Sequence, residues 1–553
     1  MVKKHIYLGL ILLLAILLRF WSLGNNPPSL TWDEAAWGYN AYSLGIDGRD
    51  EFGRLLPFNY LESFGDFKPP MYAYLDIIPI KIFGLNEFAV RFPSAFFGVL
   101  TVLITYFLTK RIFWDSKSKE VYALFSALFL AISPWHINLS RAAFEANVAT
   151  FFIVVGVWLF LVAVQGKKWV ILLSVSSFVL SIYTFNTARI VSPILLILLS
   201  LIFWRTLWRI KYQTFMAVVL GVVLIAPIAS FLVSPQARLR FKEVNIFWNL
   251  DVIERTNQEI ENDGSAWWSK IIHNRRLAFG VEYIKHYFDH LNPSFLFIKG
   301  DGNPKFSTQD VGQLYLWELP FFIVGMLLLF RKREGSWWIV PLWLLIGIVP
   351  AATARETPHA LRIETTLPTF QIFTAYGVFV FINAISKINP STSSGQKSKI
   401  QMKHLIFSMY ILFLLFNFLY YIHGYYVHYP REYSGEWQYG YKESIEYVKS
   451  VENQYDQILI TSAMGRPYIY YAFFTKTDPE SFRKTAIVKR DPFGFVTVSG
   501  FLKYRFADNL SSIKSKTRKT LYIDVPGRVH PKGDILKRFY LLNGAEALTA
   551  YRL

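Results

Sequence analysis

Long uninterrupted apolar runs are the feature of this sequence that most narrows what it can fold into. Several of them reach about 17–20 residues, the length that an α-helix needs to cross a bilayer core of roughly 30 Å. The clearest runs lie at 6–18, 147–165, 169–183, 190–204, 214–233, 314–330, 337–353 and 404–422. Only 18% of the residues are charged, whereas soluble proteins carry about 25%. The sequence therefore predicts an α-helical polytopic membrane protein.

The distribution of charge between the apolar runs predicts the orientation. We expect about eleven spans, at roughly 6–23, 88–110, 120–134, 147–165, 169–185, 189–204, 214–232, 314–330, 337–354, 363–385 and 404–428. With the N-terminus in the cytoplasm, the cytoplasmic connections are rich in Lys and Arg, and Asp115 and Glu334 are their only acids. This excess of Lys and Arg is typical of cytoplasmic loops. We expect a plasma-membrane domain at 1–430, with loops 24–87 and 233–313 outside the cytoplasm.

Residues 431–553 differ in character from the apolar part of the chain. Short runs rich in β-branched and aromatic residues predict strands at 457–462, 494–498 and 520–525. The pattern of 440–453 predicts an amphipathic helix. We therefore expect a small soluble α/β domain outside the cytoplasm.

Charge and cysteine content exclude several classes of function. The formal charge of +19 suits a nucleic-acid binder. The basic residues, however, cluster between apolar runs, which is the orientation signal of a membrane protein, so no nucleic-acid partner is expected. The chain contains no cysteine. Disulfides, thiolate catalysis and Cys-ligated metal centres are thereby excluded.

Most of the unusual ionisable residues fall on the predicted outer boundary. Charged groups at membrane depth are costly, so such residues tend to be functional or paired. We expect these side chains to converge on one active site: Asp33, Glu34, Lys68, Arg141, Glu145, Arg189, His359 and Arg362.

Asp33 and Glu34 are the expected catalytic acids. A carboxylate pair beside aromatic residues suits a general base for an acceptor hydroxyl or amine. The alternative is structural, because Thr31 or Asp33 followed by Glu34 is also typical of a helix start. Glu145 is a further expected catalytic acid. Arg141 would orient it from position i−4 of a shared helix, or the two would only pair with each other.

The basic residues are expected to bind a phosphate. Lys68 precedes two prolines and offers a compact charge, unless it only extends to the membrane interface. Arg189 and Arg362 offer forked guanidinium donors. His359 is expected either to move a proton or to donate a structural hydrogen bond.

The sequence has no P-loop, no HExxH motif and no dinucleotide fingerprint. An enzyme working outside the cytoplasm also lacks a nucleotide supply. We therefore expect an activated donor that arrives through the membrane as a lipid phosphate. Neutralising the charge of a phosphate leaving group needs no cofactor, although a divalent metal shared by Asp33 and Glu145 stays open.

Four motifs together resemble the GT-C glycosyltransferases: Asp33-Glu34, Lys68-Pro-Pro, Arg91-Phe-Pro-Ser-Ala, and the segment from Arg141 to Glu145. Within that class the chain is similar to the dolichyl-phosphate-mannose protein mannosyltransferases and to bacterial relatives such as the lipid A aminoarabinose transferases. The resemblance covers most of residues 1–385.

The resemblance implies a polyprenyl-phosphate-linked sugar donor and inverting transfer to a protein, lipid or glycan acceptor. It implies that Asp33 acts as base or positions the acceptor, and that Lys68 contacts the lipid phosphate. Glu145 stands where relatives often carry Asp, which leaves its role open. The alternatives are an oligosaccharyltransferase or ligase that uses a lipid diphosphate donor, and a non-enzymatic transporter or flippase.

Overall fold

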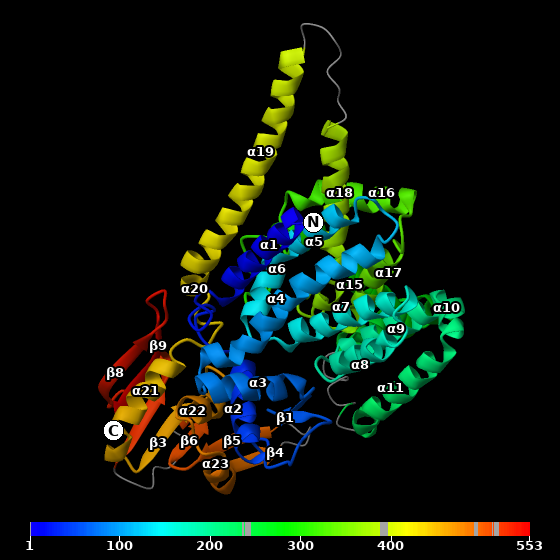
Figure 1. Cartoon of the computed structure of the whole chain (residues 1–553). Coiled ribbons are helices and arrows are strands. Elements are labelled where there is room, and N and C mark those ends of the chain that lie inside the picture. Colours follow the sequence, from blue (N-terminus) through cyan, green and yellow to red (C-terminus); the bar gives the residue numbers. More distant parts are fainter. Residues whose placement is uncertain are drawn as a thin grey trace. The chain divides into compact units, whose positions relative to one another are not determined.

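The computed structural model describes residues 2–553 except 235–236, 238–244, 387–395, 491–495, 511–512 and 514–518. Packing divides the chain into two compact units, each assembled from separate stretches of sequence (Figure 1). Unit 1 comprises Met1–Leu18, Phe97–Leu139 and Ala146–Ile422. Unit 2 comprises Arg19–Phe96, Ser140–Glu145 and His423–Leu553. The predicted division at residue 430 concerns membrane character rather than packing and stays a prediction.

Unit 1 is built from helices, and each predicted span contains one. The helices that lie in it or reach into it are α1 (Val2–Phe20), α4 (Glu87–Ile112), α5 (Lys119–Ile132), α6 (Pro134–Arg141), α7 (Glu145–Val164), α8 (Val170–Ile182), α9 (Ala188–Ile202), α10 (Trp204–Arg209), α11 (Lys211–Leu232), α13 (Leu250–Asn262), α14 (Ser269–Ile272), α15 (Arg275–Asp289), α16 (Glu318–Lys332), α17 (Ile339–Ile348), α18 (Thr369–Ser386) and α19 (Gln396–His423).

Within the described residues, four helices are long and apolar enough to cross a membrane: Glu87–Ile112, Glu145–Val164, Lys211–Leu232 and Ser408–Glu432. Helices α5 and α6 count as a fifth span if the 55° bend between them is accepted as a break within one span. The bend falls at Ser133-Pro134, where proline lacks the N–H needed to continue the helix. Four further apolar helices are shorter, so the expected number of eleven spans stays a prediction.

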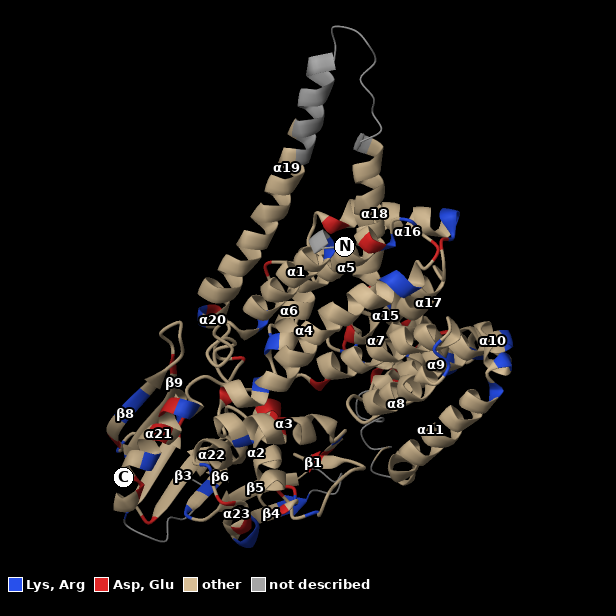
Figure 2. Ribbon diagram, viewed as in Figure 1, with Lys and Arg blue, Asp and Glu red and all other residues tan. Residues whose placement is uncertain are grey.

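Basic residues mark the ends of several helices of unit 1. Figure 2 shows Lys and Arg on α10 and at the end of α16. Arg209 lies in the last turn of α10, and Arg331 and Lys332 lie in the last turn of α16. These are the segments that the charge pattern assigns to the cytoplasmic side, and that orientation stays a prediction.

Unit 2 joins the first polar loop to the C-terminal sheet. The loop contributes α2 (Trp32–Asp47), the hairpin β1 (Leu61–Ser63) and β2 (Asp66–Lys68), and α3 (Met71–Phe83). The tail contributes α20 (Tyr429–Glu432), α21 (Tyr441–Val451), α22 (Pro467–Phe474), α23 (Pro479–Thr485) and the strands β3 (Gln457–Thr461), β4 (Ile487–Arg490), β5 (Val496–Phe501), β6 (Tyr504–Ala507), β7 (Thr520–Asp524), β8 (Asp534–Tyr540) and β9 (Glu546–Arg552).

The tail has the α/β character expected from its sequence. Its seven strands form one sheet in the order β4-β5-β6-β3-β7-β9-β8. The central strand β3 runs parallel to β6 and β7, and the other pairings are antiparallel. Helix α22 packs against α2 so closely that a Cβ at Gly38 would meet the ring of Phe473. The sheet domain and the first loop therefore share one core.

Helix α3 is buried on one side and has exposed apolar residues on the other. One side is buried, including Tyr72, Ala73 and Ile80, whereas Ile78 and Ile82 are 66% and 67% exposed. An apolar side that is open to the surroundings is what a helix lying in a membrane interface requires.

Two glycines allow the backbones of α16 and α18 to approach each other closely in unit 1. A Cβ at Gly325 would collide with the carbonyl oxygen of Phe373, and one at Gly377 with that of Phe321. Small residues let membrane helices approach this closely. We predict that Gly325→Leu lowers the apparent midpoint of thermal unfolding in detergent, because overpacking costs about 1–3 kcal/mol or more.

The matched control is Gly280→Leu on α15, where a Cβ would meet no atom within 4 Å. Differential scanning fluorimetry of the three proteins checks the prediction. Equal midpoints for Gly325→Leu and Gly280→Leu would show that the close crossing does not stabilise unit 1.

Candidate active site

Glu34 begins α2 and is fully engaged inside unit 2. Thr31 Oγ1 accepts from Glu34 N at 3.2 Å, and Glu34 Oε2 accepts from Thr31 N at 2.9 Å. This is the reciprocal cap that starts many helices. Arg91 Nε and Ala143 N donate to Glu34 Oε1 at 2.9 and 3.0 Å. Its side chain is only 1% exposed and anchors the start of α2, and the expected catalytic role of Glu34 stays a prediction.

Arg91 completes this anchor. Its guanidinium is buried and donates to the carbonyl oxygens of Leu23 and Pro27 at 3.1 and 2.8 Å, and to that of Ser29. One side chain thereby ties the loop before α2 to the first turns of α4. The motif that begins with Arg91 therefore acts through structure.

Asp33 lies one residue before Glu34 and points elsewhere. Its carboxylate is 50% exposed and forms an ion pair with Lys68 Nζ, whose side chain is only 9% exposed. The expected convergence of Asp33 with Lys68 is thus present in the structure. A half-exposed carboxylate held beside a nearly buried cation is accessible to a substrate and keeps a defined position.

The β1–β2 hairpin and two aromatic rings position Lys68. It ends β2, and Pro69 and Pro70 then lead into α3. Its Nζ lies 5.2 Å from the ring centre of Trp37 and 5.3 Å from that of Phe64. Such faces attract a cation and limit its movement.

Arg141 and Glu145 do not share a helix face, so that expectation is wrong. Helix α6 ends at Arg141, the chain turns through 142–144, and α7 begins at Glu145. Glu145 is partly exposed, and Lys68 and Asp33 are among the charges that act on it. Glu145 therefore lies close enough to Asp33 and Lys68 to be affected by their charges.

Arg141 is buried, and its donors are directed at protein groups. They bind the carbonyl oxygens of Arg19, Trp21 and Asn26 at 3.2, 2.8 and 2.8 Å, and Tyr425 Oη at 3.2 Å. A guanidinium with 0% exposure has no surface to offer a lipid phosphate. These contacts give Arg141 a structural role, and its expected role in donor binding stays a prediction.

Arg189, His359 and Arg362 lie in unit 1. Arg189 is the second residue of α9, and its guanidinium is 5.5 Å from the ring centre of Phe231. Arg362 Nη1 donates to Glu356 O at 3.1 Å. The expected donor-binding roles of these three residues stay predictions.

Asp301 organises the loop that carries His359. Its carboxylate accepts from the backbone N of Asn303 and Ala360 at 2.8 and 2.6 Å, and His359 Nδ1 lies 3.9 Å away. Burial raises the pKa of Asp301 to about 6. Burial and then the charge of Arg362 lower the pKa of His359 well below its usual value. A neutral imidazole suits hydrogen bonding better than charge neutralisation of a phosphate.

Arg466 is a candidate residue that the sequence analysis missed. It follows β3, its φ is +27°, and its guanidinium lies 4.3 Å from the ring centre of Phe64, the ring that Lys68 also faces. A Cβ at Gly465 would press on Trp32, so glycine lets this loop approach α2. The usable signal was its position after a buried strand, because ligands of α/β sheets bind at the carboxyl ends of strands.

Glu51 joins the segments beneath this cluster. Its carboxylate accepts from Asn40 Nδ2, Ser63 Oγ and Tyr468 Oη at 3.1, 2.8 and 3.2 Å. It thus connects α2, the β1–β2 hairpin and α22. Burial raises the pKa of Glu51 to about 7.

The described residues contain no group of three or more His, Asp or Glu side chains arranged to hold a metal ion. The charged groups of the candidate site are the Asp33–Lys68 pair, Glu145, and Arg466, which faces the same Phe64 ring as Lys68.

The raised pKa of Glu51 predicts how stability depends on pH. The folded protein holds this proton more tightly than the unfolded chain, whose glutamate has a pKa near 4.5. The resulting stability is present below about pH 4.5 and is lost as pH rises through about 7, by up to about 3 kcal/mol. We predict that Glu51→Gln flattens the fall in unfolding midpoint between pH 5 and pH 8.

The control is Glu480→Gln, in a pair whose side chains are 69% and 66% exposed. Thermal unfolding followed by tryptophan fluorescence checks the difference in pH slope. If Glu51→Gln keeps the full slope of the unchanged protein, Glu51 does not carry that proton.

Comparisons with known proteins agree with this architecture. Residues 67–231 match the family model described as dolichyl-phosphate-mannose-protein mannosyltransferase. An uncharacterised protein of Aquifex aeolicus (strain VF5) is 31% identical over 220 residues, which are 38% of this chain and 40% of that protein. The alignment thus spans less than half of this relative.

Two solved proteins share the fold. ArnT from Cupriavidus metallidurans matches 98% of this chain and 97% of its own at 13% identity, with a TM-score of 0.55 in the apo state and 0.53 when bound to undecaprenyl phosphate. The apo oligosaccharyltransferase of Archaeoglobus fulgidus matches 85% of this chain and 63% of its own, at 13% identity and a TM-score of 0.52. The chain therefore has the GT-C fold, and its resemblance to the dolichyl-phosphate-mannose protein mannosyltransferases is confirmed over residues 67–231.

Proposed function

We propose that the protein is a membrane glycosyltransferase that moves a sugar from a polyprenyl-phosphate-linked donor to a protein, lipid or glycan acceptor on the extracytoplasmic side. The observation that carries the proposal is the accessible Asp33 paired with the nearly buried Lys68. The match of residues 67–231 to the mannosyltransferase model supports the reaction class. The fold shared with ArnT, which has been solved with undecaprenyl phosphate, supports the donor class.

In the proposed step Asp33 takes a proton from the acceptor hydroxyl or amine. The acceptor atom attacks the anomeric carbon, the bond from that carbon to the phosphate oxygen breaks, and polyprenyl phosphate leaves with the bonding electrons. A single displacement inverts the configuration. The base contributes typically 10²–10⁴-fold to such a step.

Lys68 and Arg466 would receive the leaving phosphate. Both cations lie over the ring of Phe64, at 5.3 and 4.3 Å from its centre. A phosphate bound to Lys68 would give it a second anionic partner and weaken its hold on Asp33. Binding of the donor would thereby release the carboxylate to act as base. Glu145 would orient the acceptor from the other side of the pair.

This scheme uses no cofactor, because two protein cations neutralise the departing charge. A lipid diphosphate donor would need a divalent metal more strongly. We therefore expect sugar transfer to persist in the presence of EDTA.

We predict that Asp33→Asn lowers the release of free polyprenyl phosphate by about 10²–10⁴-fold, because the acceptor loses its base. The assay uses membranes that contain the full chain, a polyprenyl-phosphate sugar as donor, and mass spectrometry of the released lipid. Glu480→Gln on α23 is the charge-matched control and should keep full activity.

Three outcomes would count against the scheme. Full turnover by Asp33→Asn would show that Asp33 is not the general base. Movement of the donor across the bilayer without sugar transfer would favour a transporter. Activity only with a diphosphate donor, and its loss in EDTA, would favour the oligosaccharyltransferase alternative.

We predict that Arg466→Gln raises the apparent KM for the donor by about tenfold, because one charge-assisted contact to the phosphate is lost. Arg466→Lys should recover part of the loss. Arg528→Gln, at an exposed arginine of the same sheet domain, is the control. An unchanged donor KM in Arg466→Gln would show that Arg466 does not contribute to donor binding.

A further inference from the structure

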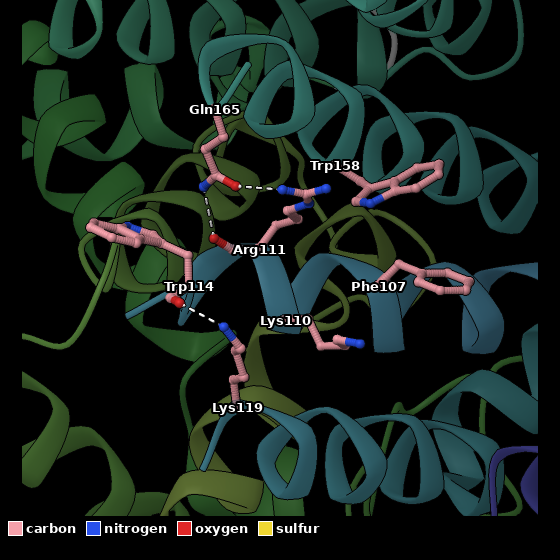
Figure 3. Close-up of a pocket in the computed structure, with 7 residues that line it drawn as sticks. All are labelled: Phe107, Lys110, Arg111, Trp114, Lys119, Trp158 and Gln165. Carbon is pink, nitrogen blue, oxygen red and sulfur yellow. Dashed lines mark hydrogen bonds between the residues drawn. The ribbon is translucent and has the colours of Figure 1, made fainter. Parts of the chain in front are cut away.

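A hollow in unit 1 is lined by residues that play no part in the site described above. It has a volume of about 580 Å³. It is lined by Phe107, Lys110, Arg111, Trp114, Lys119, Trp158 and Gln165 (Figure 3). We call the hollow lined by these residues the basic pocket.

The basic pocket lies where two membrane-length helices end. Helix α4 ends at Ile112, and Lys110 and Arg111 form its last turn. Helix α7 ends at Val164, and Gln165 follows it. Both helices are long and apolar enough to span a bilayer. The ends of such helices are expected where the hydrocarbon core of a bilayer meets the lipid headgroups.

The lining carries a net positive charge. It contains three cations and no acid. Glu120, just outside it, lies 2.7 Å from Lys110 Nζ and balances that charge. Arg111 Nη1 donates to Gln165 Oε1 at 3.1 Å, and Lys119 Nζ donates to Trp114 O at 2.8 Å. These oxygens are uncharged, so the charges of Arg111 and Lys119 are not neutralised by these bonds.

Both cations keep donor capacity. A guanidinium has five N–H donors and an ammonium has three. The bonds to Gln165 and to Trp114 use one donor of each. Arg111 suits forked binding of phosphate oxygens, and Lys119 adds a compact charge.

Aromatic rings complete the basic pocket. Phe107 and Trp158 lie next to each other, with ring centres 5.8 Å apart, and Figure 3 shows Trp114 on the opposite side. The side chain of Trp114 is 55% exposed. Tryptophan is enriched at this depth because its amphipathic ring suits the headgroup level. An occupant therefore meets cations and apolar ring faces in one site.

We propose that the basic pocket binds the phosphate headgroup of an anionic phospholipid. Arg111 and Lys119 hold the phosphate, and the rings of Phe107 and Trp158 pack against the glycerol and the first acyl carbons. A soluble anion would use the cations but leave the rings without a partner. Basic pockets between membrane helices are suited to such headgroups. The site is separate from the proposed transfer reaction and does not depend on it.

The test is native mass spectrometry of the full chain released from detergent, with phosphatidylglycerol or phosphatidylethanolamine of equal acyl length added. We expect one retained phosphatidylglycerol and little phosphatidylethanolamine. The double variant Arg111→Gln with Lys119→Gln should lower phosphatidylglycerol occupancy by at least about tenfold, since charge-assisted bonds are lost.

The matched control is the double variant Lys167→Gln with Lys168→Gln. It removes the same charge just beyond α7, from exposed side chains outside the lining. It should keep the retained lipid. Equal loss in both double variants would reveal only a general attraction to anionic lipid and would overturn the site.

Two further measurements separate headgroup recognition from misfolding and from the binding of a soluble anion. Gln165→Glu places a negative charge at an exposed lining position and should also reduce phosphatidylglycerol binding. This single variant tests the site if the first double variant fails to fold. Displacement of the lipid by millimolar inorganic phosphate alone would point to a soluble anion. Equal retention of both lipids would overturn headgroup recognition.

Discussion

The buried pair of Glu34 and Arg91 is the interaction on which the rest of unit 2 depends. Two charges with 1% and 0% exposure are tolerated only because each is surrounded by hydrogen-bonding partners. Removing either partner would leave an uncompensated charge, at a cost of about 3–5 kcal/mol. The pair fixes the start of α2, and through that start it fixes the direction of Asp33.

The two adjacent acids are thus divided between two tasks. Successive residues of a helix point about 100° apart. Glu34 therefore turns into the core toward Arg91, while Asp33 turns toward Lys68 and remains half exposed. The buried polar anchor beside Asp33 thereby fixes the direction of that accessible carboxylate. The same logic applies to Arg141, whose bonds to three carbonyl groups hold the loop that leads toward α2.

Local patterns in the sequence predicted much of this arrangement. Apolar length located a helix in every expected span, and β-branched runs located β3, β5 and β7. The approach of Lys68 to Asp33 was expected because both residues were placed at the outer boundary of the membrane. The helix face shared by Arg141 and Glu145 was wrong, because the turn at 142–144 separates α6 from α7. Arg466 escaped notice, because only tertiary packing of the β3 loop on Trp32 brings it to Phe64.

The discontinuous make-up of unit 2 has a consequence for biosynthesis. Tyr470 Oη donates to Leu30 O, and Tyr468 Oη to Glu51, across more than 400 residues of sequence. The polar loop therefore leaves the ribosome more than 400 residues before these packing partners. Until they arrive, the apolar surfaces of α2 and of the hairpin lack their native cover. These apolar surfaces therefore wait for their native partners while more than 400 further residues are synthesised.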